Sequence, residues 1–183
     1  MNNVEINKQA RLGEHLTSSS VAALSHSSEL DGLRLTPHFT LAELCKTSVK
    51  TKDGNIPSRV AIENLKRLTG WLEKLRARVN PLPTSPRGGE VPIIINSGYR
   101  SPQVNKLVGG VATSNHLTGC AVDIRVLGME QLLRYAVILL DISDESGEDF
   151  DELLIERNAK GSYWLHFAVR PEGNRRKIKL LEG

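Results

Sequence analysis

The 183-residue sequence predicts an α+β fold in which a small antiparallel sheet is flanked by helices. Residues 58–79 repeat apolar side chains at helical spacing, which is typical of a long amphipathic helix. Several short runs, among them "AVDIRV" and "YWLHFAV", are rich in β-branched and aromatic residues and alternate as strands do. Because the helical pattern precedes the strands in separate blocks, we expect an α+β arrangement.

The N-terminal segment, residues 1–34, combines a Ser-rich patch ("TSSSVAALSHSSE") with scattered apolar positions of no sustained period. We expect a poorly ordered extension there and a compact domain over residues 35–183. At the start of that domain, Thr40 is a predicted helix N-cap, with Glu43 completing a capping box.

The long helix is expected over residues 58–79, with Trp71 on its buried side. Its predicted apolar face consists of Val60, Ile62, Leu65, Leu68, Leu72, Leu75 and Val79. The breaker-rich segment "NPLPTSPRGGE" then predicts a loop.

The remaining elements follow from shorter patterns. "VPIIINSGYR" predicts a buried strand that delivers Ser97 to Arg100 at its C-terminal end. "SPQVNKLVG" predicts a short helix, "AVDIRV" a strand and "GMEQLLRYAVILLDIS" a helix. "FDELLIE" and "YWLHFAV" predict two further strands joined by the turn-prone "RNAKGS".

Composition limits the class of function. A net charge of +3, from 24 basic and 21 acidic residues, is too even for a dedicated nucleic-acid binder. The tail "RPEGNRRKIKLLEG" is locally basic, so nucleic-acid binding is an alternative resting on charge alone; the tail could instead attract anionic wall polymer. Two cysteines are too few for a disulfide framework, and we expect both to be small buried residues.

No run of about 18 apolar residues is present, so we expect no membrane span. The first residues also lack the apolar core of a secretory signal. We therefore expect a monomer that is cytoplasmic as synthesised.

One stretch, "SNHLTGCAVDI", places His116 and Asp123 seven positions apart. Strand alternation sends Asp123 to the face opposite its two β-branched neighbours. A buried carboxylate is costly unless it is paired or bound to a metal. In "WLHFAV", His166 shares one strand face with Trp164.

A catalytic zinc site needs three imidazole or carboxylate ligands and one open position. His116, Asp123 and His166 are candidates for these ligands. From the residues alone, a second interpretation stays open, in which the histidines are hydrogen-bonded in the core and Asp123 pairs with a buried arginine.

These segments together resemble the zinc D-alanyl-D-alanine carboxypeptidase and L-alanyl-D-glutamate endopeptidase family, which cleaves peptidoglycan stem peptides. Ser114, His116 and Asp123 match the family's Ser-x-His-x(6)-Asp signature, and "WLHFAV" supplies its second histidine. "INSGYRSPQVNKLVGG" is similar to its arginine segment, and "LTPHFTLAEL" resembles the opening of its phage-like branch. The resemblance spans about residues 35–179.

The resemblance implies a zinc metallopeptidase with one Zn²⁺ at the sheet face, held by His116, Asp123 and His166. It further implies that Arg100 engages a substrate carboxylate through its planar fork and that Ser114 lies near the substrate. We also place Trp164 in the wall of the substrate pocket. Arg100 could instead be an ion-pair residue and Ser114 a turn residue.

The general base departs from the family pattern, because Tyr163 stands where many relatives carry glutamate. We predict that Glu156 replaces it. If Leu154 pairs with His166, Glu156 lies opposite Trp164 and on the face of the imidazole. The alternatives are a salt bridge from Glu156 to Arg157, Arg175 or Arg176, or a base supplied by Asp151, Glu152 or the Tyr163 hydroxyl.

The predicted function is hydrolysis of amide bonds in peptidoglycan stem peptides, by a carboxypeptidase or an endopeptidase according to whether the pocket beyond Arg100 is closed. The alternative is a catalytically silent wall-binding or structural module that keeps zinc for stability. A substrate outside the membrane implies release through a holin-type pore during phage lysis, or carriage on a phage particle. A periplasmic protein with a cleaved N-terminus would exclude both routes.

Overall fold

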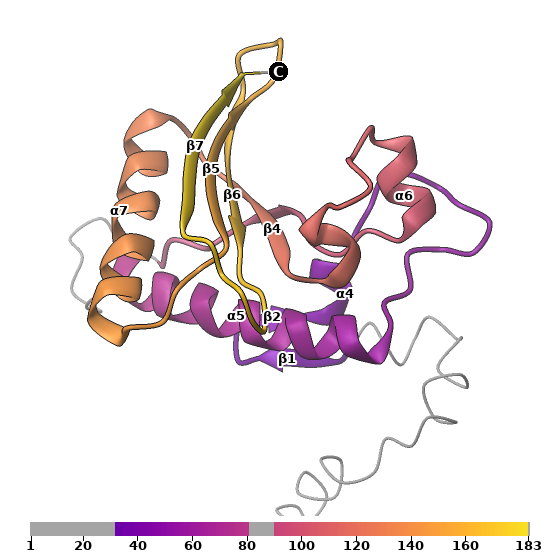
Figure 1. The fold of residues 1–183 in the computed structure, drawn as a ribbon, viewed down its shortest axis with the longest axis horizontal. Helices are drawn as coiled ribbons and strands as arrows, with labels where there is room; N and C mark the ends of the chain where they lie inside the picture. The colour runs from indigo at the N-terminus through magenta and orange to yellow at the C-terminus, as the bar shows by residue number, and fades with distance from the viewer. Residues whose placement is uncertain (1–31, 81–89, 183) are drawn as a thin grey trace, which may run out of the picture.

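A computed structural model describes residues 32–80 and 90–182 of the chain. Its centre is a five-stranded sheet with the strand order β3-β4-β6-β5-β7 (Figure 1). All neighbouring pairs are antiparallel except β5 and β7, which are parallel. The strands are β3 (Ile95–Ser97), β4 (Ala121–Arg125), β5 (Glu152–Arg157), β6 (Tyr163–Ala168) and β7 (Lys177–Glu182).

The predicted fold class is confirmed, with one difference in the sheet. The basic tail forms β7, which lies parallel to β5 at the edge, so the sheet is mixed rather than wholly antiparallel. A separate two-stranded sheet joins β1 (Arg34–Thr36) and β2 (Phe39–Thr40). The predicted extension lies outside the described residues up to position 31, and most of the predicted loop after Asn80 also lies outside them.

The helices begin close to their predicted positions. Thr40 and Ser58 act as N-caps, with side-chain oxygens that accept from the Glu43 and Ala61 amides at 3.2 Å each. The helical elements are α4 (Leu41–Leu44), α5 (Arg59–Val79), α6 (Pro102–Leu107), the 3₁₀ turn η2 (Asn115–Thr118) and α7 (Met129–Ser146). Among the described residues, no helix combines the length and the apolar character that crossing a membrane requires.

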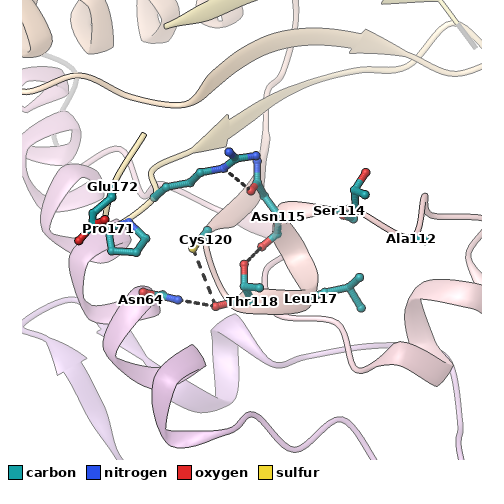
Figure 2. Close-up of a pocket in the computed structure, with 11 residues that line it drawn as sticks. Asn64, Ala112, Ser114, Asn115, Leu117, Thr118, Cys120, Pro171 and Glu172 are labelled. Carbon is teal, nitrogen blue, oxygen red and sulfur yellow. Dashed lines mark hydrogen bonds between the residues drawn. The ribbon is translucent and has the colours of Figure 1, made fainter. Parts of the chain in front are cut away.

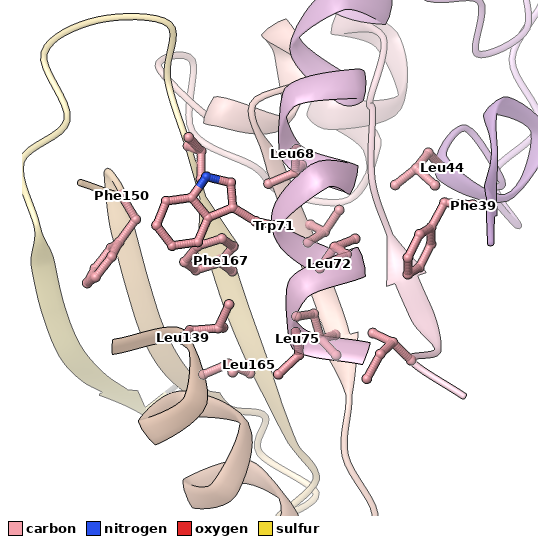
Figure 3. Close-up of a cluster of buried hydrophobic side chains, with 14 of the residues drawn as sticks. Phe39, Leu44, Leu68, Trp71, Leu72, Leu75, Leu139, Phe150, Leu165 and Phe167 are labelled. Carbon is pink, nitrogen blue, oxygen red and sulfur yellow. The ribbon is translucent and has the colours of Figure 1, made fainter. Parts of the chain in front are cut away.

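The core lies between one face of the sheet and the helices α5 and α7. Trp71 of α5 packs against Phe167 of β6, with ring centroids 5.4 Å apart (Figure 3). Leu68 and Leu72 on the same helix are fully buried. Each such leucine contributes about 1.5–3 kcal/mol by leaving water. Since these helices cover only one face, the opposite face of β4 and β6 is free to carry polar side chains.

Three predictions about buried residues were wrong. Val60, assigned to the apolar face of α5, is 70% exposed because it lies in the first turn of the helix, on the side away from the core. The strand before Arg100 is not fully buried, and Ile94 is 41% exposed. The reason is that β3 is an edge strand of three residues that pairs only with β4. Cys120 is buried as expected, Cys45 is partly exposed, and both are free thiols.

Candidate metal centre

Asp123 and His166 meet because they lie directly opposite each other in the antiparallel β4–β6 ladder. Their neighbours Val122, Ile124 and Phe167 turn into the core. Strand alternation therefore sends the carboxylate and the imidazole together to the other face. The distance from Asp123 Oδ1 to His166 Nδ1 is 2.9 Å.

His116 reaches the same place from η2, the turn that precedes β4. The Ser114 hydroxyl caps this turn by accepting from the His116 amide at 3.3 Å. Gly119 ends the turn with φ at 72°, and a Cβ there would lie 2.5 Å from the carbonyl oxygen of Ala61. Glycine is thus required both by conformation and by space. The turn places His116 Nε2 3.3 Å from Asp123 Oδ1.

Each imidazole is also held through its other nitrogen. His116 Nδ1 lies 2.6 Å from the carbonyl oxygen of Gly98, and His166 Nε2 lies 3.5 Å from Glu152 Oε2. Metal-binding histidines commonly have such partners, which fix the ring orientation and the tautomer. The arrangement leaves His116 Nε2 and His166 Nδ1 both directed at Asp123.

The three side chains form a group that could hold a metal ion. Their ligand atoms all lie within 4.8 Å of one another, and all three residues are buried. Two imidazoles and one carboxylate are the donor set of catalytic zinc sites, in which a fourth position stays open. The residues present therefore fit a zinc ion.

The charges in this group are strongly coupled. Burial alone would raise the pKa of Asp123, but the adjacent His116 and His166 outweigh it and hold that pKa well below its usual range. Burial would lower the pKa of His166, yet its contacts with Asp123 and Glu152 raise it to about 9. A metal ion binds only the unprotonated form of an imidazole ring.

Arg100 contacts the same carboxylate from the other side. Its Nη2 donates to Asp123 Oδ2 at 2.5 Å, and its Nε donates to Ser97 Oγ at 2.8 Å. The sequence analysis assigned Arg100 to a carboxylate of the substrate. In the structure the guanidinium forms an ion pair with Asp123, as in the alternative assignment. Substrate binding by Arg100 stays a prediction.

A cleft of about 860 Å³ runs over the group of three. Its lining includes every residue that the sequence analysis assigned to the site: Arg100, Ser114, His116, Asp123, Glu156, Trp164 and His166. The sequence reasoning therefore identified residues that come together in space, although their individual roles are predictions.

The predicted hairpin register is confirmed. Leu154 pairs with His166, and Glu156 lies opposite Trp164. Burial, the largest influence, raises the pKa of Glu156; the nearby His166 lowers it and Asp123 raises it further, with a net increase. A raised pKa suits a carboxylate that takes and returns a proton near neutral pH. Arg175 and Arg176, two suggested salt-bridge partners of Glu156, pair with other acidic residues.

Trp164 contributes a polar group as well as a wall to the cleft. Its indole Nε1 is buried and makes no hydrogen bond of ordinary geometry among the described residues, but it lies close enough to the Glu156 carboxylate to act on that group as a donor and to lower its pKa. A buried indole N–H normally finds an acceptor. Within the cleft, Glu156 is the nearest acceptor for this donor.

A smaller cavity of about 420 Å³ adjoins the cleft (Figure 2). Both are lined by Ser114 and Asn115, which precede His116 in the chain. Asn64 of α5, which also lines the smaller cavity, donates to the Thr118 carbonyl at 2.9 Å and so holds the η2 turn against the helix. The wall shared by the two spaces is thus the segment that carries a candidate metal ligand.

The sequence analysis missed a polar cluster beside the metal group. Asn115 Nδ2 donates to Asp151 Oδ2 at 2.7 Å and to Glu152 Oε2 at 3.0 Å. Arg170 and Arg175 both pair with Asp151. From the sequence, Arg170 stood out only as part of a basic tail and Arg175 also as a possible partner of Glu156, while Asp151 and Glu152 were weaker candidates for the base. Only the fold of the tail brings these residues next to the acids.

Two histidines and one aspartate at an open cleft are a donor set typical of catalytic zinc sites. The chain belongs to the Peptidase M15 family, whose model matches residues 37–139. That match includes Arg100, His116 and Asp123 but ends before Glu156 and His166.

A curated relative supports the same family. Over 87 residues the chain is 33% identical to the zinc D-Ala-D-Ala carboxypeptidase of Streptomyces albus G. The similar region is 48% of this chain and 31% of that protein, so the chain aligns with less than a third of the relative's length.

Proposed function

We propose that the protein is a zinc peptidase that hydrolyses amide bonds in peptidoglycan stem peptides, with residues 35–183 as the catalytic domain. The observation that carries the proposal is the buried group of His116, Asp123 and His166 on the floor of an open cleft. Membership of the Peptidase M15 family and the similarity to a zinc D-Ala-D-Ala carboxypeptidase support the metal and the substrate class.

In this proposal His116 Nε2, an Asp123 oxygen and His166 Nδ1 hold the zinc. When bound, zinc polarises a carbonyl and lowers the pKa of a coordinated water. Glu156, on the same strand face as His166, takes the proton of the attacking water and returns it to the leaving amine. Arg100 keeps Asp123 oriented through Oδ2 and has further N–H groups for the substrate.

The other residues of the cleft position the peptide. Trp164 forms part of the cleft wall against which the peptide packs. Ser114, at the boundary between the cleft and the smaller cavity, lies where a peptide would pass from one to the other. Two adjoining spaces are suited to a chain that continues beyond the scissile bond, which favours an endopeptidase over a carboxypeptidase.

The test compares the wild type with Glu156→Gln and His116→Ala, measuring bound zinc and the products released from purified peptidoglycan by mass spectrometry. We expect one zinc per wild-type chain. We expect Glu156→Gln to keep zinc and to lose about 100- to 10,000-fold in activity, because the proton acceptor is gone. His116→Ala should lose both metal and activity.

Glu148→Gln is the control, since Glu148 pairs with Lys74 on the surface, and it should behave as the wild type. Stoichiometric zinc without any cleavage by the wild type would support the silent wall-binding module instead. The absence of bound metal would refute the proposal. The mass of the products separates the two peptidase types, because a carboxypeptidase releases a single residue.

A further inference from the structure

The turn that follows β6 holds two arginines at one end of the cleft. Arg170 and Arg175 both line the cleft that contains the metal group. Asn174 closes the turn between them: its Oδ1 accepts from the Arg170 amide at 2.8 Å, and its Nδ2 donates to the Arg170 carbonyl at 3.1 Å. The Asn174 side chain therefore fixes the backbone turn that connects the two arginines.

Both arginines are anchored on one buried acid. Arg175 Nε and Nη2 donate to the two oxygens of Asp151 at 2.7 and 2.8 Å, and Arg170 Nε lies 2.9 Å from Asp151 Oδ2. The Asp151 side chain is fully buried, whereas those of Arg170 and Arg175 are 33% and 45% exposed. Asp151 thus holds Nε of both arginines and Nη2 of Arg175, while both side chains remain partly accessible to solvent.

Donors remain free on both arginines. Within the part of the chain that the structure describes, Arg170 uses only Nε, and Arg175 leaves Nη1 without a partner. The cluster also contains Lys177 and Glu152. Three cations (Arg170, Arg175, Lys177) against two carboxylates (Asp151, Glu152) leave a net charge of +1.

The backbone is bent to keep this arrangement. Arg176 has φ at 47°, a left-handed conformation that is uncommon for a residue other than glycine. It directs the Arg176 side chain to Asp144 and Asp149, on the helical side, while its neighbour Arg175 faces the cleft. Strained residues of this kind occur where a structure holds a site in place.

We propose that Arg170 and Arg175 form a carboxylate-binding subsite that selects peptides with a free carboxylate outside the scissile amide bond. The inference rests on the proposed peptidase function and names the substrate feature that the cleft recognises. Among the described residues, Arg170 keeps both terminal nitrogens free and can offer them as a fork, which suits a carboxylate because it donates two parallel charge-assisted hydrogen bonds. Arg175 adds its free Nη1 as a further donor. Arg100 uses the same two nitrogens as Arg175, with Nε on Ser97 and Nη2 on Asp123, so the fork of the subsite comes from Arg170.

The carboxylate can come from the C-terminus of the peptide or from a glutamate within it. Two pairs of synthetic stem peptides distinguish these sources, with one carboxylate free or amidated in each pair. For the pair that the subsite recognises, we expect wild-type kcat/KM to be about 10- to 100-fold higher for the free form, the range for hydrogen bonds to a charged group.

Arg170→Gln and Arg175→Gln should reduce this preference by lowering kcat/KM for the free form only. Arg176→Gln is the matched control, because Arg176 is adjacent in sequence but pairs on the other side, and it should keep the preference. If a glutamine variant leaves Asp151 unpaired and does not fold, the lysine variant replaces it. Lysine keeps the charge but offers no fork, so the preference should fall there too.

Equal cleavage of free and amidated forms in both pairs by the wild type would overturn the subsite but leave the peptidase intact. Persistence of the preference in the variants of both arginines would overturn the subsite as well. Failure of the wild type to cleave any of the four peptides, with zinc bound, would instead count against the proposed function. Variants that slow all four peptides equally would assign the arginines a structural role only.

Discussion

Asp123 uses its two carboxylate oxygens in different directions. Oδ1 faces both histidines, and Oδ2 accepts from Arg100. A carboxylate with one oxygen fixed by an arginine cannot rotate freely, so the oxygen offered to a metal stays in place. The same principle applies on the far side of His166, where Glu152 faces the second ring nitrogen.

Glu152 is therefore expected to support metal binding without touching the metal. Glu152→Ala should weaken zinc binding by about 10- to 100-fold, because His166 loses the partner that orients its ring. Glu152→Gln should lose less, since the amide oxygen still accepts from the imidazole. Competition with a chromophoric chelator measures the affinity. Glu148→Ala serves as the control, and an affinity for Glu152→Ala equal to the wild type would contradict this role.

At the scale of the elements, α5 carries much of the core, and its exposed and buried faces can be compared directly. Leu72→Ala should lower the free energy of unfolding by about 2–5 kcal/mol, because Leu72 is fully buried and a cavity remains. Val60→Ala on the same helix should change it by about 0.5 kcal/mol or less, since Val60 is 70% exposed. Urea unfolding measures both, and a loss at Val60 comparable to that at Leu72 would contradict the assigned faces.

The strands show what sequence patterns can predict. Alternation in "AVDIRV" and "YWLHFAV" correctly separated the core face from the site face, because one face is strongly apolar. The pairing of Leu154 with His166 was the condition on which the Glu156 prediction depended, and the structure has this register. The edge position of β3 could not be predicted from its sequence. Apolar β-branched runs occur in both central and edge strands, and the local sequence does not specify the pairing partners of a strand.

The parallel placement of β7 was also beyond local patterns. Lys177 and Lys179 alternate with Ile178 and Leu180 as in any edge strand, and nothing in that alternation indicates direction. The approach of the arginines that precede β7 to the buried acid depends on this placement, so the polar cluster could not be predicted. The metal group could be predicted, because His116 and Asp123 belong to a motif of fixed spacing and the family resemblance added His166.

For the whole molecule, Asp151 links the sheet to the chain that follows β6, and its charge connects stability to pH. Burial by itself would raise the pKa of Asp151, but hydrogen bonds from Arg175 and Asn115 and the charge of Arg170 lower it. The folded-state pKa is therefore below the unfolded value of about 3.9. The resulting stabilisation is present above that pH and is lost as the pH falls through the folded-state pKa.

Asp151→Asn should thus be less stable than the wild type at pH 7, and the difference should shrink as the pH falls below about 4. Urea unfolding between pH 3 and pH 7 measures this. Asp53→Asn is the control, since Asp53 is exposed, and it should follow the wild-type profile. A constant difference between Asp151→Asn and the wild type over the whole range would show that the charge of Asp151 does not stabilise the fold.

The pairing of β4 with β6 has a consequence for how the protein is made. Asp123 and His166 are 43 residues apart, and α7 and β5 lie between them in the chain. At about 5–20 residues per second, a ribosome needs roughly 2–9 s to translate that interval. During this time β4 cannot pair with β6, because β6 has not been synthesised, and the three candidate ligands cannot come together. The nascent protein therefore acquires its metal-holding group late in translation, after most of the domain has been synthesised.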